Sequence, residues 1–240
     1  MSKFNRGVDE DYFEFQGDVI PDRLATTSDS GSISVGSSTT GSSSLRLDNS
    51  NNGDNEYAEV DMGAVNYRAQ DGKMYFEARF LLERVISGVN IGFNDETTDG
   101  GNTLPIELSG TTFASNASTW VGVVYDNDAT TDNFYFFFVD GDTDTTEAIA
   151  NLDSGVAAEA SVWYTVRIDV DDVNSSSKAR ATISIQKDSS PATFASKTFT
   201  SSITRSTGMT PHIGIENRTT TGAYTDIDYM LVGKGRVADA

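Results

Sequence analysis

The segment Asp48–Glu59 has the residue types and spacing that come closest to a metal site in this sequence. It fits the EF-hand calcium-loop pattern, with oxygen-bearing side chains at positions 1, 3, 5 and 9, Gly53 at position 6 and a glutamate at position 12. The candidate ligands are Asp48, Ser50, Asn52 and Glu59. The flanking residues alternate like strands instead of helices, and Asn55 stands where an aliphatic residue normally anchors such a loop. We therefore expect a turn-rich loop and no required metal cofactor, with calcium binding as the alternative.

Some acidic residues are spaced so that they share one face of a strand. Such a pair could catalyse glycoside hydrolysis, which needs two carboxyl groups in one cleft. The candidate pairs are Asp226 with Asp228, Asp169 with Asp171, and Glu77 with Glu83. None of them lies in the Glu-x-Asp-x-x-Glu strand pattern of β-sandwich glycosidases, so we expect these carboxylates on a solvated outer face. The sequence also lacks a Gly-x-Ser-x-Gly nucleophile motif and a phosphate-binding glycine loop. We do not expect an enzyme.

The composition excludes several classes of protein. The chain has 240 residues, with 17 basic and 36 acidic side chains, no cysteine and one histidine, His212. A net charge of −19 should repel nucleic-acid phosphates and anionic membranes. Without cysteine there is no disulfide and no cysteine-ligated metal, and a single histidine cannot form a multi-histidine site. We expect His212 to be a hydrogen-bonded structural residue.

Alternation of apolar and polar residues, the pattern of half-buried strands, recurs along the chain, whereas helical periodicity is almost absent. The expected strands are 12–15, 31–35, 44–47, 56–60, 73–82, 89–93, 120–125, 133–139, 162–171, 178–187, 212–216 and 224–232. About a dozen strands without a helix for a parallel crossover predict an all-β fold, an antiparallel β-sandwich.

No change in composition divides the chain. We expect an N-terminal arm, residues 1–20, that leads into the first strand, and a single β-sandwich domain over residues 21–240. The first residues contain no apolar signal segment, so we expect synthesis and folding in a cytoplasm. The longest apolar run is far shorter than the roughly 20 residues that span a bilayer.

That run, Phe134–Val139, is apolar on both faces. Such a strand is either covered on both sides within one chain, or it meets another subunit on its outer face. The candidates for self-association are Phe134, Phe136 and Phe138. Trp120 and Trp163 could stack on sugar rings, although core packing is the more common role of a tryptophan.

Segments in the C-terminal half resemble the closing strands of concanavalin A-like, or laminin G-like, jelly rolls. They are 163–170, 181–186, Pro211-His-Ile-Gly-Ile-Glu-Asn and 225–230. The resemblance covers roughly residues 55–235 and implies a concanavalin A-like jelly roll. The metal-binding run of legume lectins, Glu-x-Asp-x-x-x-Asn-x-x-x-Asp-x-x-His, has no match here, so their metal ligands are not carried over.

The opening segment, 6–24, resembles virion structural proteins of tailed bacteriophages that carry such a domain. This resemblance implies a capsid decoration (cement) protein on the virion surface, made in the host cytoplasm, whose partner is the major capsid protein. Threefold capsid sites would favour a homo-trimer. The alternative is a lectin-like, carbohydrate-binding appendage on a head or tail fibre, with glycans as partners. Neither function implies a nucleic acid, a membrane or a cofactor.

Basic residues gather near both ends of this acidic chain. In jelly rolls of this kind the first and last strands often pair, which would bring these charges to one pole. We expect that pole to dock on the capsid, with aromatic side chains as apolar anchors. The docking candidates are Lys3, Phe4, Arg6, Tyr12, Phe13, Lys234 and Arg236. The alternative is that the arm completes its own domain's sheet.

Overall fold

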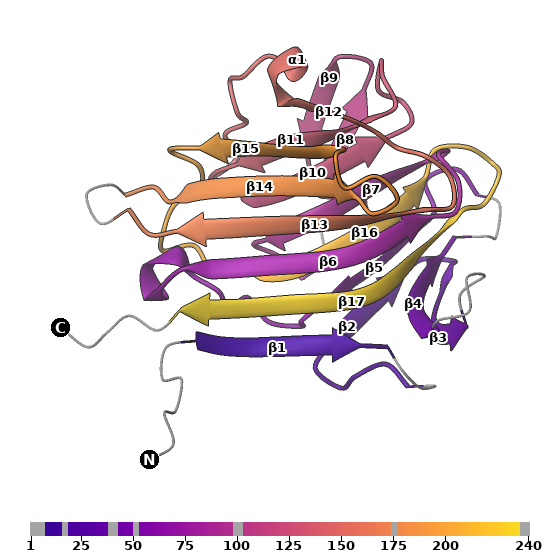
Figure 1. Ribbon diagram of the computed structural model, residues 1–240, viewed down its shortest axis with the longest axis horizontal. Coiled ribbons are helices and arrows are strands. Elements are labelled where there is room, and N and C mark those ends of the chain that lie inside the picture. Colours follow the sequence, from indigo (N-terminus) through magenta and orange to yellow (C-terminus); the bar gives the residue numbers. More distant parts are fainter. Residues whose placement is uncertain are drawn as a thin grey trace.

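The computed structural model describes residues 8–15, 19–37, 43–49, 53–97, 103–173 and 177–235. Two antiparallel sheets lie face to face, with sheet A in front in Figure 1 and sheet B behind it. This arrangement confirms the predicted all-β, antiparallel β-sandwich.

Sheet A contains most of the long strands. In spatial order they are β15 (Phe194–Phe199), β14 (Arg180–Lys187), β13 (Val162–Asp171), β6 (Met74–Leu82), β17 (Tyr224–Gly235), β4 (Ser43–Asp48) and β3 (Ser32–Ser37). The eighth strand, β1 (Val8–Glu14), pairs with the second half of β17, whereas β4 pairs with its first half.

Sheet B has seven strands. They are β12 (Asp153–Ala157), β11 (Asn133–Val139), β10 (Trp120–Asp126), β7 (Ser87–Asn94), β16 (Thr210–Asn217), β5 (Tyr57–Asp61) and β2 (Ala25–Ser28). A separate hairpin consists of β8 (Ile106–Ser109) and β9 (Thr112–Ser115). The helices of the described residues are one 3-10 turn, η1 (Ala69–Asp71), and one short helix, α1 (Ile149–Leu152), and neither is long enough to cross a membrane.

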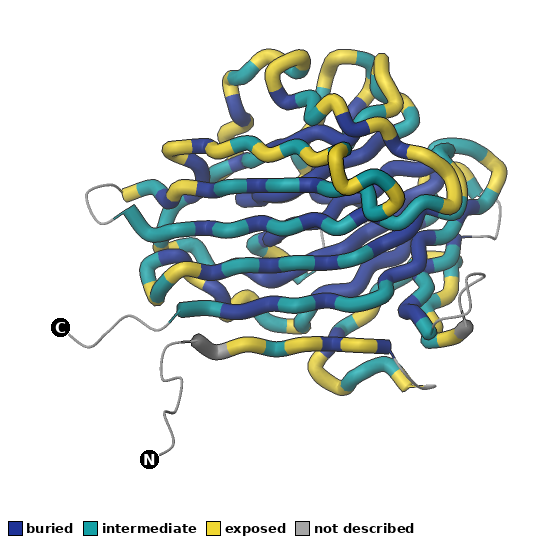
Figure 2. Tube along the Cα trace, in the orientation of Figure 1, coloured by how far each residue is buried: buried dark blue, intermediate teal, exposed yellow. Residues whose placement is uncertain are grey.

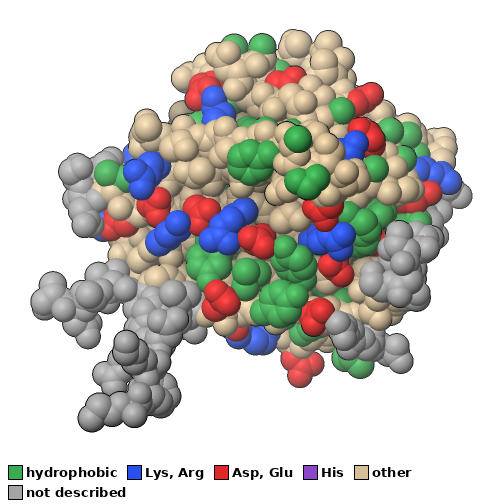
Figure 3. Space-filling model, viewed as in Figure 1, with side chains coloured by type: hydrophobic (Ala, Val, Ile, Leu, Met, Phe, Trp, Pro, Cys, Tyr) green, Lys and Arg blue, Asp and Glu red, His purple; other side chains and the backbone are tan. Residues whose placement is uncertain are grey.

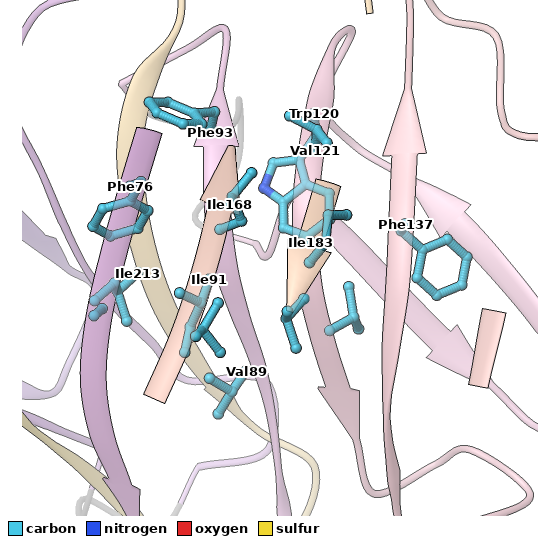
Figure 4. Close-up of a cluster of buried hydrophobic side chains, with 14 of the residues drawn as sticks. Phe76, Val89, Ile91, Phe93, Trp120, Val121, Phe137, Ile168, Ile183 and Ile213 are labelled. Atoms are coloured by element: carbon cyan, nitrogen blue, oxygen red, sulfur yellow. The ribbon is translucent and has the colours of Figure 1, made fainter. Parts of the chain in front are cut away.

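The core lies between the sheets because alternate residues of each strand point inward. In β6 the inward residues Met74, Phe76, Ala78 and Phe80 are fully buried, while the outward residues Tyr75, Glu77 and Arg79 are half-buried. Figure 2 shows this alternation of buried and intermediate positions along the strands of sheet A. Figure 4 shows part of the buried cluster, to which both sheets contribute.

The first and last strands pair, as expected. The antiparallel register of β1 and β17 places Val8 opposite Gly235 and Tyr12 opposite Leu231. The segment predicted as an N-terminal arm, residues 1–20, therefore supplies a strand of sheet A, Val8–Glu14.

The prediction that β11 offers an outward face for self-association is wrong for Phe134 and Phe136, which are 1% and 2% exposed. On the inner side, Phe134 packs against Tyr164 of sheet A with ring centroids 4.8 Å apart. On the other side, Phe113 of β9 lies 4.6 Å from the ring of Phe137. The sequence could not show that the β8–β9 hairpin covers this strand. Phe138 is half-buried.

Replacing Phe134 by alanine should destabilise the fold strongly, because the ring lies among Phe80, Tyr125 and Tyr164. We expect a loss of roughly 3–5 kcal/mol in the free energy of unfolding, measured by urea denaturation. Phe194→Ala is the matched control, since that ring is 56% exposed and its loss should change stability by less than about 0.5 kcal/mol. Equal losses in the two variants would contradict the assignment of Phe134 to the core.

Candidate functional site

The two candidate calcium ligands that the structure describes lie in different sheets. Asp48 ends β4 in sheet A, whereas Glu59 lies in β5 of sheet B, and Ser50 and Asn52 fall outside the described residues. The Glu59 carboxylate lies 2.7 Å from Nε2 of His212 and accepts a hydrogen bond from the Tyr57 hydroxyl. In the described part of the chain, no three His, Cys, Asp or Glu side chains are placed to hold a metal ion.

His212 has the structural role that the sequence predicts. Its side chain is fully buried on the outer face of sheet B and pairs with Glu59. Asp61 lies directly across from His212 in the register of β5 and β16. Burial raises the pKa of Asp61 to about 6, against the lowering effects of the Gly63 amide and His212. One Asp61 oxygen accepts the hydrogen bond from Gly63, and the other has no hydrogen-bond partner among the described residues.

Another part of this outer face is covered by residues 103–117, which we call the strap and which include the β8–β9 hairpin. The side-chain amide of Asn90 makes two hydrogen bonds to the backbone of Ile106, of 2.7 and 3.0 Å. Leu108 N–H donates to Asp126 and Leu104 N–H to Glu216, at 3.0 and 3.1 Å.

Two further features hold the strap in place. The Leu104 side chain packs so close to Gly88 and Gly214 that a Cβ at either glycine would lie within 3.0 Å of it. The guanidinium of Arg218 lies between the carboxylates of Asp126 and Glu216, and all three side chains are at most 6% exposed. Burial raises the pKa of Glu216 to about 7, although Arg218 opposes this shift. Arg218, Asp126, Glu216 and Asn90 on this face are therefore bonded within the chain itself.

The carboxylate pairs considered for catalysis lie on or beside sheet A, each with a basic partner. Asp226 accepts two hydrogen bonds from Arg46 and is fully buried, so the expectation of a solvated side chain is wrong there. Arg79 bonds Asp228, and Arg167 bonds Asp169. Figure 3 shows the resulting mixture of acidic and basic side chains around hydrophobic groups on the outer face of sheet A.

The aromatic side chains are divided between the core and this face. Trp120 is fully buried, whereas Trp163 lies half-buried on the outer face of sheet A with the Arg79 guanidinium 4.5 Å from its ring. Tyr12 is 55% exposed beside Tyr229, with ring centroids 5.8 Å apart. Phe13 is buried because adjacent strand residues face opposite sides, so its predicted role as a docking anchor is wrong. The docking candidates Lys3, Phe4, Arg6 and Arg236 fall outside the described residues.

The remaining docking candidate, Lys234, lines a cavity of about 580 Å³ at one edge of the sandwich, which we call the edge pocket. Its polar and aromatic lining residues are Asp11, Asp22, Arg23, Asn66, Tyr67 and Lys234. They come from β1 and β17 of sheet A, from the turn before β2, and from the loop after β5. Of these lining residues, only Lys234 could be singled out from the sequence, because the others belong to no motif.

Local interactions fix the walls of the edge pocket. After β5 the chain turns at Gly63, which has φ +66°, and the Asp61 carboxylate holds the Gly63 amide. Tyr67 is anchored by two backbone hydrogen bonds with Met209, of 2.8 and 3.0 Å. On the opposite wall, Leu24 N–H donates to Pro21 at 2.9 Å and closes the turn that carries Asp22.

The side chains of the edge pocket include free donors and acceptors. Asp11 forms an ion pair with Arg23, and Lys234 Nζ lies 5.9 Å from the centroid of the Tyr67 ring. The side chains of Asp22 and Asn66 are exposed and form no hydrogen bond or ion pair with another described residue. Lys234 forms no ion pair within the same part of the chain. A carboxylate, an amide and an ammonium group therefore face one cavity, beside an aromatic ring.

No family model matches the chain, and no curated protein matches its sequence. Solved structures do share its fold. A protein of unknown function, SO2946 from Shewanella oneidensis MR-1, is 14% identical with a TM-score of 0.65, over 100% of this chain and 92% of that one. Peanut lectin, solved with a 9mer peptide, is 12% identical with a TM-score of 0.63, over 97% and 99% of the two chains.

Lectin I from Ulex europaeus, in complex with the methyl glycoside of α-L-fucose, is 14% identical with a TM-score of 0.58. That match covers 95% of this chain and 98% of the lectin. Identities this low show the fold alone, which is the jelly-roll β-sandwich of legume lectins and confirms the predicted concanavalin A-like class. These similarities give no support to a phage origin.

Replacing Asp61 by asparagine should flatten the pH dependence of stability. Because the pKa of Asp61 is raised from 3.8 to about 6, the native state binds more protons than the unfolded state between these values, and stability falls as pH rises. The full effect on the free energy of unfolding is roughly 3 kcal/mol, because one pKa unit corresponds to about 1.4 kcal/mol. Urea denaturation from acidic to neutral pH should therefore give a shallower slope for Asp61→Asn than for the wild type.

Asp54→Asn is the control for this experiment, because it removes an exposed carboxylate and should keep the slope of the wild type. An unchanged slope in Asp61→Asn would show that Asp61 is not the group responsible.

Proposed function

We propose that this protein is a lectin-like carbohydrate-binding module and that the edge pocket is its sugar site. Two kinds of finding support the proposal. The fold is shared with lectins over nearly the whole chain. The described surface also contains a cavity lined by three polar side chains, those of Asp22, Asn66 and Lys234, that form no hydrogen bond or ion pair with another described residue.

The chemistry of the edge pocket suits a sugar. Sugar hydroxyls both donate and accept hydrogen bonds, so a site for them needs both kinds of partner. Asp22 accepts, Lys234 donates, and the Asn66 amide does both. A volume of about 580 Å³ lies in the range typical of small-ligand sites and is large enough for a monosaccharide or disaccharide.

One observation carries the proposal. Asp22, Asn66 and Lys234 come from three separate segments, face the same cavity, and have no ion pair with another described residue. Most other described basic side chains are paired with acids, such as Arg79 with Asp188 and Arg167 with Glu77. The edge pocket is thus a place where a ligand can satisfy polar groups that the fold has left available.

Capsid decoration stays a prediction. The major capsid protein as partner, the trimer and the virion location rest on the resemblance of the opening segment alone. The pairing of β1 with β17 does not favour capsid docking, because an arm that only completes its own domain's sheet would form the same pairing.

Glycan-array binding followed by calorimetry tests the proposed function. The wild type should bind one or more glycans, and Asp22→Ala and Asn66→Ala should each weaken binding of the best glycan roughly tenfold, since each removes one hydrogen-bonding group. Both positions are exposed, so the melting temperature should not change.

The matched control is Asp54→Ala, an exposed acid in the turn before β5 and outside the edge pocket, which should bind as the wild type does. Absence of glycan binding, or equal binding by all three variants, would contradict the assignment.

A further inference from the structure

A second cavity, of about 480 Å³, lies at the edge of the sandwich opposite the edge pocket. It is formed by the end of β11, the loop that follows it, and the end of β15. We call it the phenyl pocket, and the residues that matter here are Phe138, Thr146, Glu147, Phe199, Thr200 and Ser201.

The phenyl pocket has an aromatic wall. The rings of Phe138 and Phe199 meet edge to face, with centroids 4.9 Å apart. Phe199 is almost fully buried and the Lys197 ammonium lies 5.2 Å from its ring centroid, so Phe138 is the ring that remains half-buried at the cavity. An accessible aromatic ring in a polar cavity offers a surface for the apolar face of a ligand.

Hydroxyl groups surround this wall. Thr146, Thr200 and Ser201 are exposed, and their side chains form no hydrogen bond with another described residue. The charged residues of the walls are held in place: Glu147 pairs with Lys197 at 2.7 Å, and Lys178 bonds both Asp140 and the Thr204 hydroxyl. The pocket therefore combines a ring with free hydroxyls on walls that are already fixed.

This combination matches a pyranose ring, which has one face of C–H groups and a rim of hydroxyls. The cavity is lined by three carboxylates, of Asp140, Asp144 and Glu147, and by one ammonium group, of Lys178, so the net negative charge of its walls would disfavour a sugar that carries a negative charge. The chemistry thus selects a neutral pyranose residue.

The geometry points to a second saccharide site, and we propose that the phenyl pocket binds a neutral pyranose residue, so that one chain has two sugar sites. This inference rests on the proposed carbohydrate-binding function. The sites lie at opposite edges, since β15 and β1 are separated by five strand spacings in sheet A, about 24 Å. A single chain could then bridge two saccharide chains.

Amide NMR titration tests this proposal with three neutral probes, the methyl glycosides of glucose, galactose and mannose. At least one probe should shift the amide signals of residues 143–147 and 198–202 in a saturable way. Ser201→Trp should fill the phenyl pocket and weaken these shifts at least tenfold, while the shifts of residues 63–67 at the edge pocket remain. Asn66→Trp is the reciprocal control and should have the opposite effect.

Thr146→Trp fills the same cavity from its other wall and replaces Ser201→Trp if that variant does not keep the spectrum of a folded protein. The methyl glycoside of glucuronic acid differs from the glucoside by one carboxylate and should bind the phenyl pocket at least tenfold more weakly. Equal binding of the two would overturn the preference for a neutral sugar.

The outcomes separate the two proposals. Shifts at the edge pocket alone overturn the second site and leave the proposed function standing. Shifts at the phenyl pocket alone support the second site and overturn the edge pocket as the primary one. No shift at either pocket overturns both.

Discussion

The guanidinium of Arg218 lies between two buried carboxylates, those of Asp126 in β10 and Glu216 in β16, and the covering of sheet B by the strap depends on this interaction. Three buried charges are costly unless they are paired and hydrogen-bonded, and removing one partner of such a group typically costs about 3–5 kcal/mol. Here the carboxylates also accept backbone hydrogen bonds from Leu104 and Leu108. The same charges that satisfy Arg218 therefore fix the strap on the sheet.

The position of the strap decides where ligands can bind. With its inner face on sheet A and much of its outer face under residues 103–117, sheet B is a middle layer in that region. Its central polar side chains, such as His212 and Asn90, are closed to solvent and already bonded. The cavities lie instead at the two edges of the sandwich, where strands end and loops turn between the sheets.

Much of the fold could be predicted from the alternation of apolar and polar residues. In β6 and β13 the apolar residues of this pattern are the ones buried on the inner face of the sheet. Short or polar strands such as β2, β12 and β15 could not, since their edge positions bury too few residues to leave a pattern. Alternation also misled at Asp226. A polar residue opposite the core normally faces solvent, but Asp226 is fully buried and bonded to Arg46, which is distant in sequence.

The candidate site was less accessible to prediction. Asn66, Tyr67 and Asp22 come from separate loops and turns without a motif, and only the folded chain places them around one cavity. Lys234 was the exception, because a basic residue near the end of a very acidic chain is visible in composition. The sequence marked Lys234 as a docking candidate, and only its neighbours in the folded chain suggest a ligand for it.

The pairing of β1 with β17 also has a mechanical consequence. Val8 and Gly235 stand opposite each other, so a tensile load applied between the two ends of the described chain acts on one pair of neighbouring residues. Such a load would open the antiparallel ladder rung by rung, beginning at Val8, instead of shearing all its hydrogen bonds at once. A tether at the Val8 end alone would also load this ladder, because β1 pairs only with β17 among the described strands. A tether at the Gly235 end alone would not, because β17 is held by β6 and β4 as well. The fold is thus poorly suited to serving as a link in a chain under tension.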